Sequence, residues 1–178
     1  DYELNKCNPK EVCFGSGVKY YFKCKRGLHK SELKCIHSIT KNYIKSSDCI
    51  ACNSFAQWGI DNICSDFLEK YWDYNKNKEI DPWKIHSQSN INIWIKCQKH
   101  NYHGSYMVSC GRFYKGNRCP YCRGFKVKIF DSLGWLYPEA IKYWSDKNKK
   151  SPYEYPPMSK QKVFWECPEK QHKDYYRK

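Results

Sequence analysis

Cysteine and histidine side chains, which can bind a metal ion or serve as nucleophile and base, recur in one order along this 178-residue chain. At three places a short apolar or aromatic run ends at a cysteine, and a histidine follows five or six residues later. A Cys-x-x-Cys motif comes after each of the first two pairs. The pairs are Cys24 with His29, Cys97 with His103 and Cys167 with His172, and the motifs are Cys49/Cys52 and Cys119/Cys122.

This order of ligands predicts zinc binding, because three cysteines with one histidine are a usual tetrahedral set and a two-residue spacing lets both thiolates reach one ion. Two complete sites are predicted, from Cys24, His29, Cys49 and Cys52 and from Cys97, His103, Cys119 and Cys122. His100 is an alternative to His103 in the second site. Cys167 and His172 predict a half-site, whose other two ligands we expect beyond residue 178.

Disulfide bonds are the competing interpretation, since the chain has 12 cysteines. A Cys-x-x-Cys motif downstream of a Cys/His pair favours zinc instead. It therefore favours a reducing intracellular compartment, such as the nucleus, the cytoplasm, a viral factory or a virion. Five cysteines fall outside the predicted sites, and we expect them to be buried free thiols. They are Cys7, Cys13, Cys35, Cys64 and Cys110.

Enzymatic activity is not expected from these ligand sets. Four protein ligands leave no open position on zinc for water or substrate, so both ions should be structural. The sequence has no His-Glu-x-x-His motif, no phosphate-binding glycine loop and no nucleophile elbow. No apolar run reaches the ~20 residues that a membrane span needs, so we expect no membrane partner.

Landmark residues repeat with one period, which predicts tandem modules. Cys24, Cys97 and Cys167 are 73 and 70 residues apart, and Pro9, Pro82 and Pro152 have the same spacing. The predicted fold class is therefore small α+β zinc-stapled modules in tandem, each with a β-hairpin and a short helix. The predicted repeats are 1–60, without its N-terminal helix, 61–130, and 131–178, a partial repeat that lacks its second cysteine pair.

Each module needs a hairpin to present its first ligand pair. The alternating Ile91, Ile93 and Ile95 predict a strand that leads to Cys97, and 105–109 is the expected return strand. Helices are expected at 65–72 and 138–144. A turn of helix at 133–137, which Asp131-Ser132 could cap, is expected before the second of these. Aromatic residues at repeated positions are expected to form small cores: Tyr20, Phe22, Trp72, Trp94, Trp144 and Trp165.

The net charge of +14, from 32 Lys and Arg against 18 Asp and Glu, favours an anionic partner, most often nucleic acid. Lys, Asn, Ile and Tyr are abundant together, as AT-rich coding sequence would produce, so part of this charge has a compositional explanation. The candidate nucleic-acid contacts are basic residues near the predicted zinc sites: Lys23, Lys25, Arg26, Lys96, Lys99, Arg112, Lys115, Arg118, Arg123, Lys126 and Lys128.

The chain resembles the zinc-ribbon, treble-clef-like tandem repeat family of bacteria, plants and large DNA viruses. The residues that carry the resemblance are Tyr137-Pro138-Glu139, Trp144, Lys147-Asn148, Pro152, Ser159, Trp165 and Cys167, with Cys119-Pro120-Tyr121-Cys122. The first repeat departs from the pattern, because Cys49-Ile50-Ala51-Cys52 lacks the proline and no arginine is equivalent to Arg112. The resemblance implies DNA-related work, since members often accompany nuclease-like domains.

Two functions are therefore expected from different classes. The first is sequence-tolerant nucleic-acid binding, to DNA rather than RNA, as an accessory to a nuclease or a genome-associated protein. The alternative is a structural or protein-interaction scaffold, for example in a viral assembly, with other proteins or further repeats of the same array as partners. The sequence leaves the base preference and the oligomeric state open.

Overall fold

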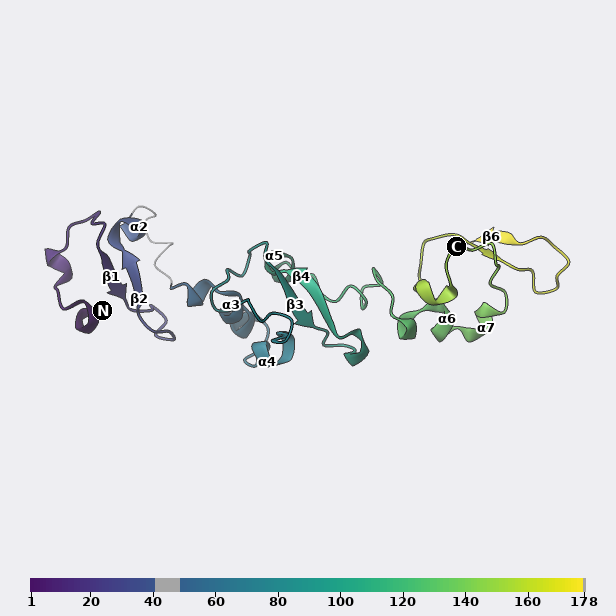
Figure 1. Cartoon of the computed structure of the whole chain (residues 1–178), viewed down its shortest axis with the longest axis horizontal. Helices are drawn as coiled ribbons and strands as arrows, with labels where there is room; N and C mark the ends of the chain where they lie inside the picture. The colour runs from purple at the N-terminus through teal and green to yellow at the C-terminus, as the bar shows by residue number, and fades with distance from the viewer. Residues whose placement is uncertain (41–48, 178) are drawn as a thin grey trace. The chain divides into compact units, whose positions relative to one another are not determined.

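The computed structural model describes residues 1–40 and 49–177, and its strands form three two-stranded sheets within that part of the chain (Figure 1). In the first and third sheets the strands are antiparallel, with Lys19 opposite Cys35 and Val163 opposite Arg177. The pairs are β1 (Lys19–Phe22) with β2 (Glu32–Cys35), β3 (Asn92–Lys96) with β4 (Ser105–Ser109), and β5 (Val163–Trp165) with β6 (Tyr175–Arg177). The predicted α+β class of short hairpins and short helices is confirmed.

Short helices accompany the sheets, and α3 is the longest described helix at eight residues. No helix in the described part of the chain is long and apolar enough to cross a membrane. The α-helices are α1 (Tyr2–Asn5), α2 (Ile36–Thr40), α3 (Phe55–Asn62), α4 (Phe67–Tyr71), α5 (Cys110–Tyr114), α6 (Leu133–Leu136) and α7 (Pro138–Ile141). The 3-10 helices are η1 (Pro9–Glu11), η2 (Ala51–Asn53), η3 (Asn101–His103), η4 (Ile129–Asp131) and η5 (Pro152–Glu154).

The chain divides into two compact units. The first comprises Asp1–Ile95 and Met107–Gly116, and it contains β1, β2 and the helices α1 to α5. The second comprises Lys96–Tyr106 and Asn117–Lys178, and it contains α6, α7, β5 and β6. Strands β3 and β4 contribute residues to both units.

The predicted elements are present with small shifts in their bounds. The helix expected at 65–72 is α4, the helix expected at 138–144 is the shorter α7, and the return strand has the bounds of β4. The earlier turn is α6, which Ser132 caps, because its hydroxyl accepts a hydrogen bond from the Trp135 N–H at 3.2 Å. Helix α3 was not predicted, although Ser54 caps it in the same way through the Gln57 N–H at 3.1 Å.

Aromatic side chains from α3, α4 and α5 form the core of the first unit. Phe55 and Phe67 are both 0% exposed, and their ring centroids are 5.5 Å apart. Phe113 lies 5.7 Å from Phe55 and is also 0% exposed. Gly59 permits the close approach of α3 and α4, because a Cβ there would lie 2.0 Å from the Phe67 ring. Burying one such side chain contributes about 1.5–3 kcal/mol, so these rings are a main source of stability.

The repeated aromatic positions pack as expected, with different degrees of burial. Trp72 is 1% exposed, whereas the other five are half-buried. In the first unit, the Lys76 ammonium lies 4.3 Å from the centroid of the Trp94 ring. In the second unit, Trp144 and Trp165 pack edge to face with centroids 5.3 Å apart. The second unit therefore has its own, smaller aromatic core.

An asparagine side chain binds the backbone of the first strand in each hairpin. The Trp94 N–H donates to Asn77 Oδ1 at 2.9 Å, and Asn77 Nδ2 donates to the Trp94 carbonyl at 2.8 Å. The side-chain amide thereby takes the place of a neighbouring strand and gives the Trp94 N–H an acceptor. The same two bonds join Asn5 to Tyr21 and Asn148 to Phe164.

Replacing this asparagine should destabilise the fold. Asn77 is 2% exposed, and Asn77→Ala leaves the Trp94 N–H without its acceptor, while the Trp94 carbonyl keeps only the Asp73 N–H at 3.3 Å. We expect a loss of about 1–3 kcal/mol in the free energy of unfolding. Urea denaturation of the zinc-loaded chain, followed by tryptophan fluorescence, measures it. Asn75→Ala is the control because Asn75 is exposed, and equal losses in the two variants would contradict the role of Asn77.

Candidate zinc sites

The first cluster joins the loop of hairpin β1–β2 to the turn before α3. Cys24 and His29 lie in the hairpin loop, while Cys49 and Cys52 lie in and beside η2. His29 Nδ1 is 3.6 Å from the Cys24 Sγ, 3.2 Å from the Cys49 Sγ and 3.4 Å from the Cys52 Sγ. The four ligand atoms lie within 4.8 Å of one another, so they converge on one position.

The second cluster has the same geometry in the second unit. His103 Nδ1 is 3.5 Å from the Cys97 Sγ, 3.6 Å from the Cys119 Sγ and 3.2 Å from the Cys122 Sγ. Of the two candidate histidines, His103 lies in the cluster. His100 packs beside it instead, with ring centroids 5.0 Å apart.

These distances fit zinc. Tetrahedral coordination with Zn–S about 2.3 Å and Zn–N about 2.0 Å places ligand atoms about 3.5–3.8 Å apart. The distances of 3.2–3.6 Å in both clusters are close to this range. Three sulfurs and one imidazole nitrogen are also a donor set that zinc prefers. The two predicted Cys3His sets therefore fit Zn²⁺, which would staple each hairpin loop to its Cys-x-x-Cys turn.

The acidity of the thiols shows why a cation suits the second cluster. Burial alone would raise the pKa of Cys97, but the backbone N–H groups of His100 and Lys99 lower it to about 7. Burial and the sulfurs of Cys97 and Cys119 raise the pKa of Cys122 to about 12, because a further negative charge is disfavoured there. A divalent cation removes this repulsion and allows all three thiols to ionise.

The histidine of the first site is held from outside by α3. With Nδ1 facing the sulfurs, His29 Nε2 donates to Gln57 Oε1 at 3.0 Å, which fixes the tautomer and the ring orientation. In the same hairpin loop, Arg26 makes a bidentate pair with Asp61 of α3 at 2.6 and 2.9 Å. These contacts tie the zinc loop of the first repeat to α3.

A carboxylate holds the histidine of the second site. His103 Nε2 donates to Asp131 Oδ2 at 2.5 Å, and the Tyr102 hydroxyl donates to Asp131 Oδ1 at 2.6 Å. Burial raises the pKa of Asp131, but these two hydrogen bonds outweigh it and lower the pKa below its ordinary value. The bond to Asp131 also raises the pKa of Tyr102 to about 12, so Tyr102 stays protonated as a donor. Asp131 is therefore a zinc-site residue and not the helix cap that the sequence suggested.

The third Cys/His pair also comes together. Cys167 Sγ lies 3.6 Å from His172 Nδ1, which is the separation of Cys24 and His29 in the first site. The hydrogen bond from His172 lowers the pKa of Cys167 to about 7. The predicted half-site thus has the ligand spacing of the complete ones.

The remaining cysteines differ in exposure. All 12 cysteines are free thiols, in agreement with zinc rather than disulfides. Cys110 is buried at the start of α5, as expected. Cys13 is exposed, so the expectation of burial was wrong there, because it lies in the loop between η1 and β1. The expectation also fails in part for three half-buried thiols, Cys7, Cys35 and Cys64.

The basic residues that the sequence singled out lie mainly on the surface. Arg26 is exposed as well, but its guanidinium already makes two hydrogen bonds to the carboxylate of Asp61. Two are half-buried, Lys96 and Lys128. The other eight are exposed: Lys23, Lys25, Lys99, Arg112, Lys115, Arg118, Arg123 and Lys126.

In both clusters a hairpin loop and a following Cys pair supply the four ligands of one ion. Residues 68–125 match a family described as a probable treble clef zinc finger domain. The matched residues include all four ligands of the second site. The resemblance inferred from the sequence is therefore confirmed for this segment. No curated protein matches the sequence.

The metal content of variants tests the two sites. We expect two zinc ions per chain by elemental analysis, and one in Cys119→Ser, since the remaining three ligands should bind zinc too weakly to retain it. Cys13→Ser is the control because its thiol is exposed and outside both clusters, and it should keep two. Unchanged zinc in Cys119→Ser would rule out the second site.

The Asp131 carboxylate should tighten zinc binding at the second site. Residues that orient a metal-binding histidine are worth about 10–100-fold in affinity, so Asp131→Asn should weaken that site by this factor. The first site should be unchanged, because Gln57 holds its histidine. Competition with a chromophoric chelator measures both sites. The control is Asp146→Asn at an exposed position, and a loss as large as that of Asp131→Asn would argue against the assignment.

Proposed function

We propose that this zinc-binding treble clef protein binds nucleic acid, DNA in preference to RNA, through basic residues around its second zinc site. The observation that carries the proposal is the distribution of charge. Residues 96–128 contain eight Lys and Arg and no Asp or Glu, a net charge of +8 out of +14 for the whole chain. A Cys3His site with Zn²⁺ subtracts one charge, which leaves most of this excess.

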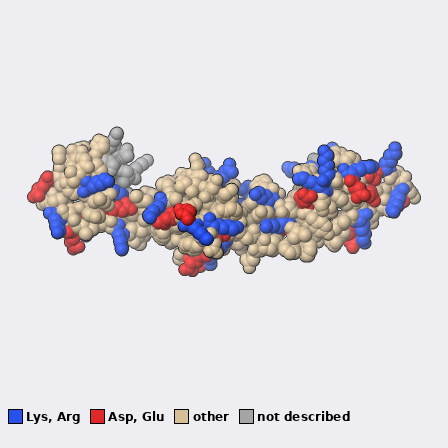
Figure 2. All heavy atoms as spheres, in the orientation of Figure 1, with Lys and Arg blue, Asp and Glu red and all other residues tan. Residues whose placement is uncertain are grey.

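The high positive charge of residues 96–128 argues against amino-acid composition as its only explanation. Residues 61–95 have four Lys and six Asp and Glu, so a lysine-rich composition does not make every segment basic. The basic segment is also the one that forms the second zinc site. On the face drawn in Figure 2, Lys and Arg side chains are visible on each part of the chain.

The turn that closes the second site presents cations beside aromatic rings. The Arg123 guanidinium lies 4.9 Å from the centroid of the Phe125 ring, and Phe125 is 71% exposed. The Lys128 ammonium lies 5.2 Å from the Tyr121 ring. Cations that reach phosphates next to an exposed ring that can stack on a base are a common arrangement for sequence-tolerant binding.

The zinc ions would serve structure in this proposal, and no catalytic role is assigned to the chain. Both ligand sets supply four protein ligands, which supports structural zinc. The thiolate ligands require a reducing environment, so the proposal places the protein in an intracellular compartment, as an accessory to a nuclease or a genome-associated protein.

Fluorescence anisotropy with a labelled DNA duplex tests the proposal. The zinc-loaded chain should bind with log K falling linearly with log salt between about 50 and 200 mM. The variant Arg118→Ser, Arg123→Ser, Lys126→Ser and Lys128→Ser should bind more weakly. Its salt slope should be smaller by about 0.9 for each phosphate contact that is lost. An RNA duplex of the same length should bind less tightly than the DNA.

A control variant removes the same charge from exposed lysines outside residues 96–128: Lys10→Ser, Lys19→Ser, Lys78→Ser and Lys84→Ser. It should keep most of the affinity, and both variants should keep two zinc ions. If the control loses as much affinity as the test variant, the binding is a general effect of charge. An absence of binding at about 50 mM salt would refute the proposal and favour the protein-interaction scaffold.

A further inference from the structure

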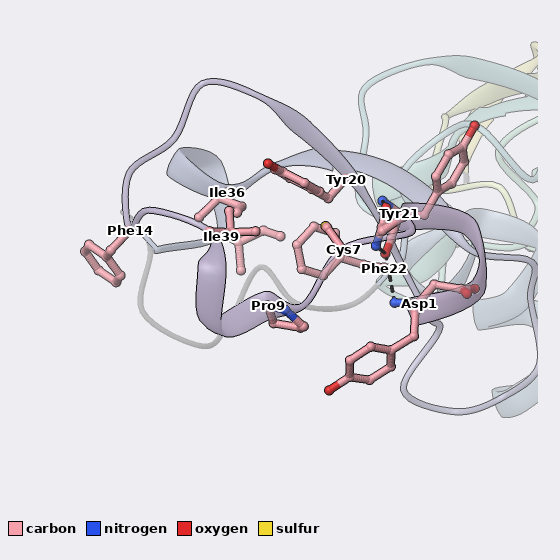
Figure 3. A pocket seen from close by; sticks show the side chains of 12 residues that line it. Asp1, Cys7, Pro9, Phe14, Tyr20, Tyr21, Phe22, Ile36 and Ile39 are labelled. Carbon is pink, nitrogen blue, oxygen red and sulfur yellow. Dashed lines mark hydrogen bonds between the residues drawn. The ribbon is translucent and has the colours of Figure 1, made fainter.

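An apolar cavity lies in the N-terminal part of the first unit, and none of its lining residues is a ligand of a zinc site. It has a volume of about 300 Å³, about twice that of a dry cavity that holds one benzene ring. Figure 3 shows Tyr20, Phe22, Ile36 and Ile39 around it, from β1 and α2. Phe14 lines it as well and is 76% exposed.

Equivalent hydrogen bonds show which residues of the next repeat correspond to this lining. Asn5 binds Tyr21 as Asn77 binds Trp94, so Tyr20 and Phe22 correspond to Ile93 and Ile95. The N–H groups of His37 and Gly111 donate to the carbonyls of Ser16 and Ser89, so Ile36 and Ile39 correspond to Cys110 and Phe113. These four of the twelve lining residues thus have the counterparts Ile93, Ile95, Cys110 and Phe113.

The counterparts are completely covered in their own repeat. All four are 0% exposed. The cover comes from α3, α4 and the residue that follows α4, because Phe55 lies 5.7 Å from Phe113 and Trp72 forms a β-bridge with Ile95. At the start of α3, the Phe55 N–H donates to the Ile85 carbonyl at 2.8 Å.

The polar anchor of this helix is also present beside the cavity. Val12 lies three residues after Pro9, as Ile85 lies three after Pro82, and Val12 lines the cavity. In the second unit the same position is Tyr155, whose carbonyl accepts from the Leu133 N–H at 2.7 Å. In two repeats, therefore, this carbonyl receives the first N–H of a helix that carries apolar side chains into the core.

We propose that the cavity is a docking site for a short helix pair of another treble clef module, one that presents aromatic side chains as α3 and α4 present Phe55, Phe67 and Trp72. Two rings of the incoming helices fill the cavity against Phe22 and Ile39, and the first N–H of the leading helix donates to the Val12 carbonyl. Modules of this kind are thereby joined end to end through the same contacts that build each core. This site is independent of nucleic-acid binding.

A peptide in trans tests the docking site. The probe is a fluorescein-labelled peptide of residues 54–73 of this chain with Cys64→Ser, which contains α3 and α4. The chain's own α3 and α4 are packed in the second core, so they do not compete with the peptide for the cavity. The zinc-loaded chain should therefore bind the peptide saturably, with Kd below about 100 μM. A peptide with Phe55→Ala, Phe67→Ala and Trp72→Ala should bind at least tenfold more weakly.

Two variants of the chain locate the binding. Ile39→Asp places a charge in the cavity and should weaken peptide binding at least tenfold. Val18→Asp introduces the same charge at a position that is 57% exposed and outside the cavity lining, and should leave binding unchanged. Both should retain two zinc ions, which shows that the first site still folds.

Three results would overturn the proposal. The first is that the chain, loaded with zinc and present at about 100 μM, the upper limit of the expected Kd, binds no peptide. The second is equal binding by the Ile39→Asp and Val18→Asp chains. The third is concentration-dependent dimerisation of the chain that Ile39→Asp abolishes, which would assign the cavity to a second copy instead.

Discussion

The structure depends on bringing three sulfurs and one imidazole within 4.8 Å of one another at two places. Without a cation this arrangement is unfavourable, as the pKa of about 12 at Cys122 shows, since neighbouring sulfurs resist the ionisation of one more thiol. Zinc turns the same proximity into a favourable interaction and couples ion binding to folding. The short hairpins need this coupling, because a two-stranded sheet alone is marginally stable in water.

Each site also connects one repeat to the next. His29 and Arg26 in the first hairpin loop bind Gln57 and Asp61 of α3, and α3 supplies Phe55 to the following core. Helix α3 thus links two repeats, because it holds the zinc-site histidine of the first and supplies Phe55 to the core of the second. The proposed docking site extends the same idea, because it assigns the uncovered lining of the first repeat to a helix pair of the kind that covers the second.

The metal ligands could be predicted from the sequence, because the chemistry of zinc restricts both the residue types and their spacing. The strands at Ile93 and Ile95 and the return strand at 105–109 were also predictable from alternation and period. Helix α3 was not, since it has only eight residues and its polar Gln57 and Asp61 are held by the first zinc loop, a contact that no local pattern marks. The partners of the histidines, Gln57 and Asp131, lie 28 residues from them, and no local pattern marks such contacts. The asparagines that bind the first strands could have been found from their spacing, because Asn5, Asn77 and Asn148 are 72 and 71 residues apart.

X-ray absorption spectroscopy at the zinc edge tests the central claim most directly, because it counts the atoms bound to the ion. The account requires an average of three sulfurs at about 2.3 Å and one nitrogen at about 2.0 Å around each zinc. Spectra that require an oxygen ligand from water in place of sulfur or imidazole, or four sulfurs and no nitrogen, would contradict two closed Cys3His sites as the basis of this fold.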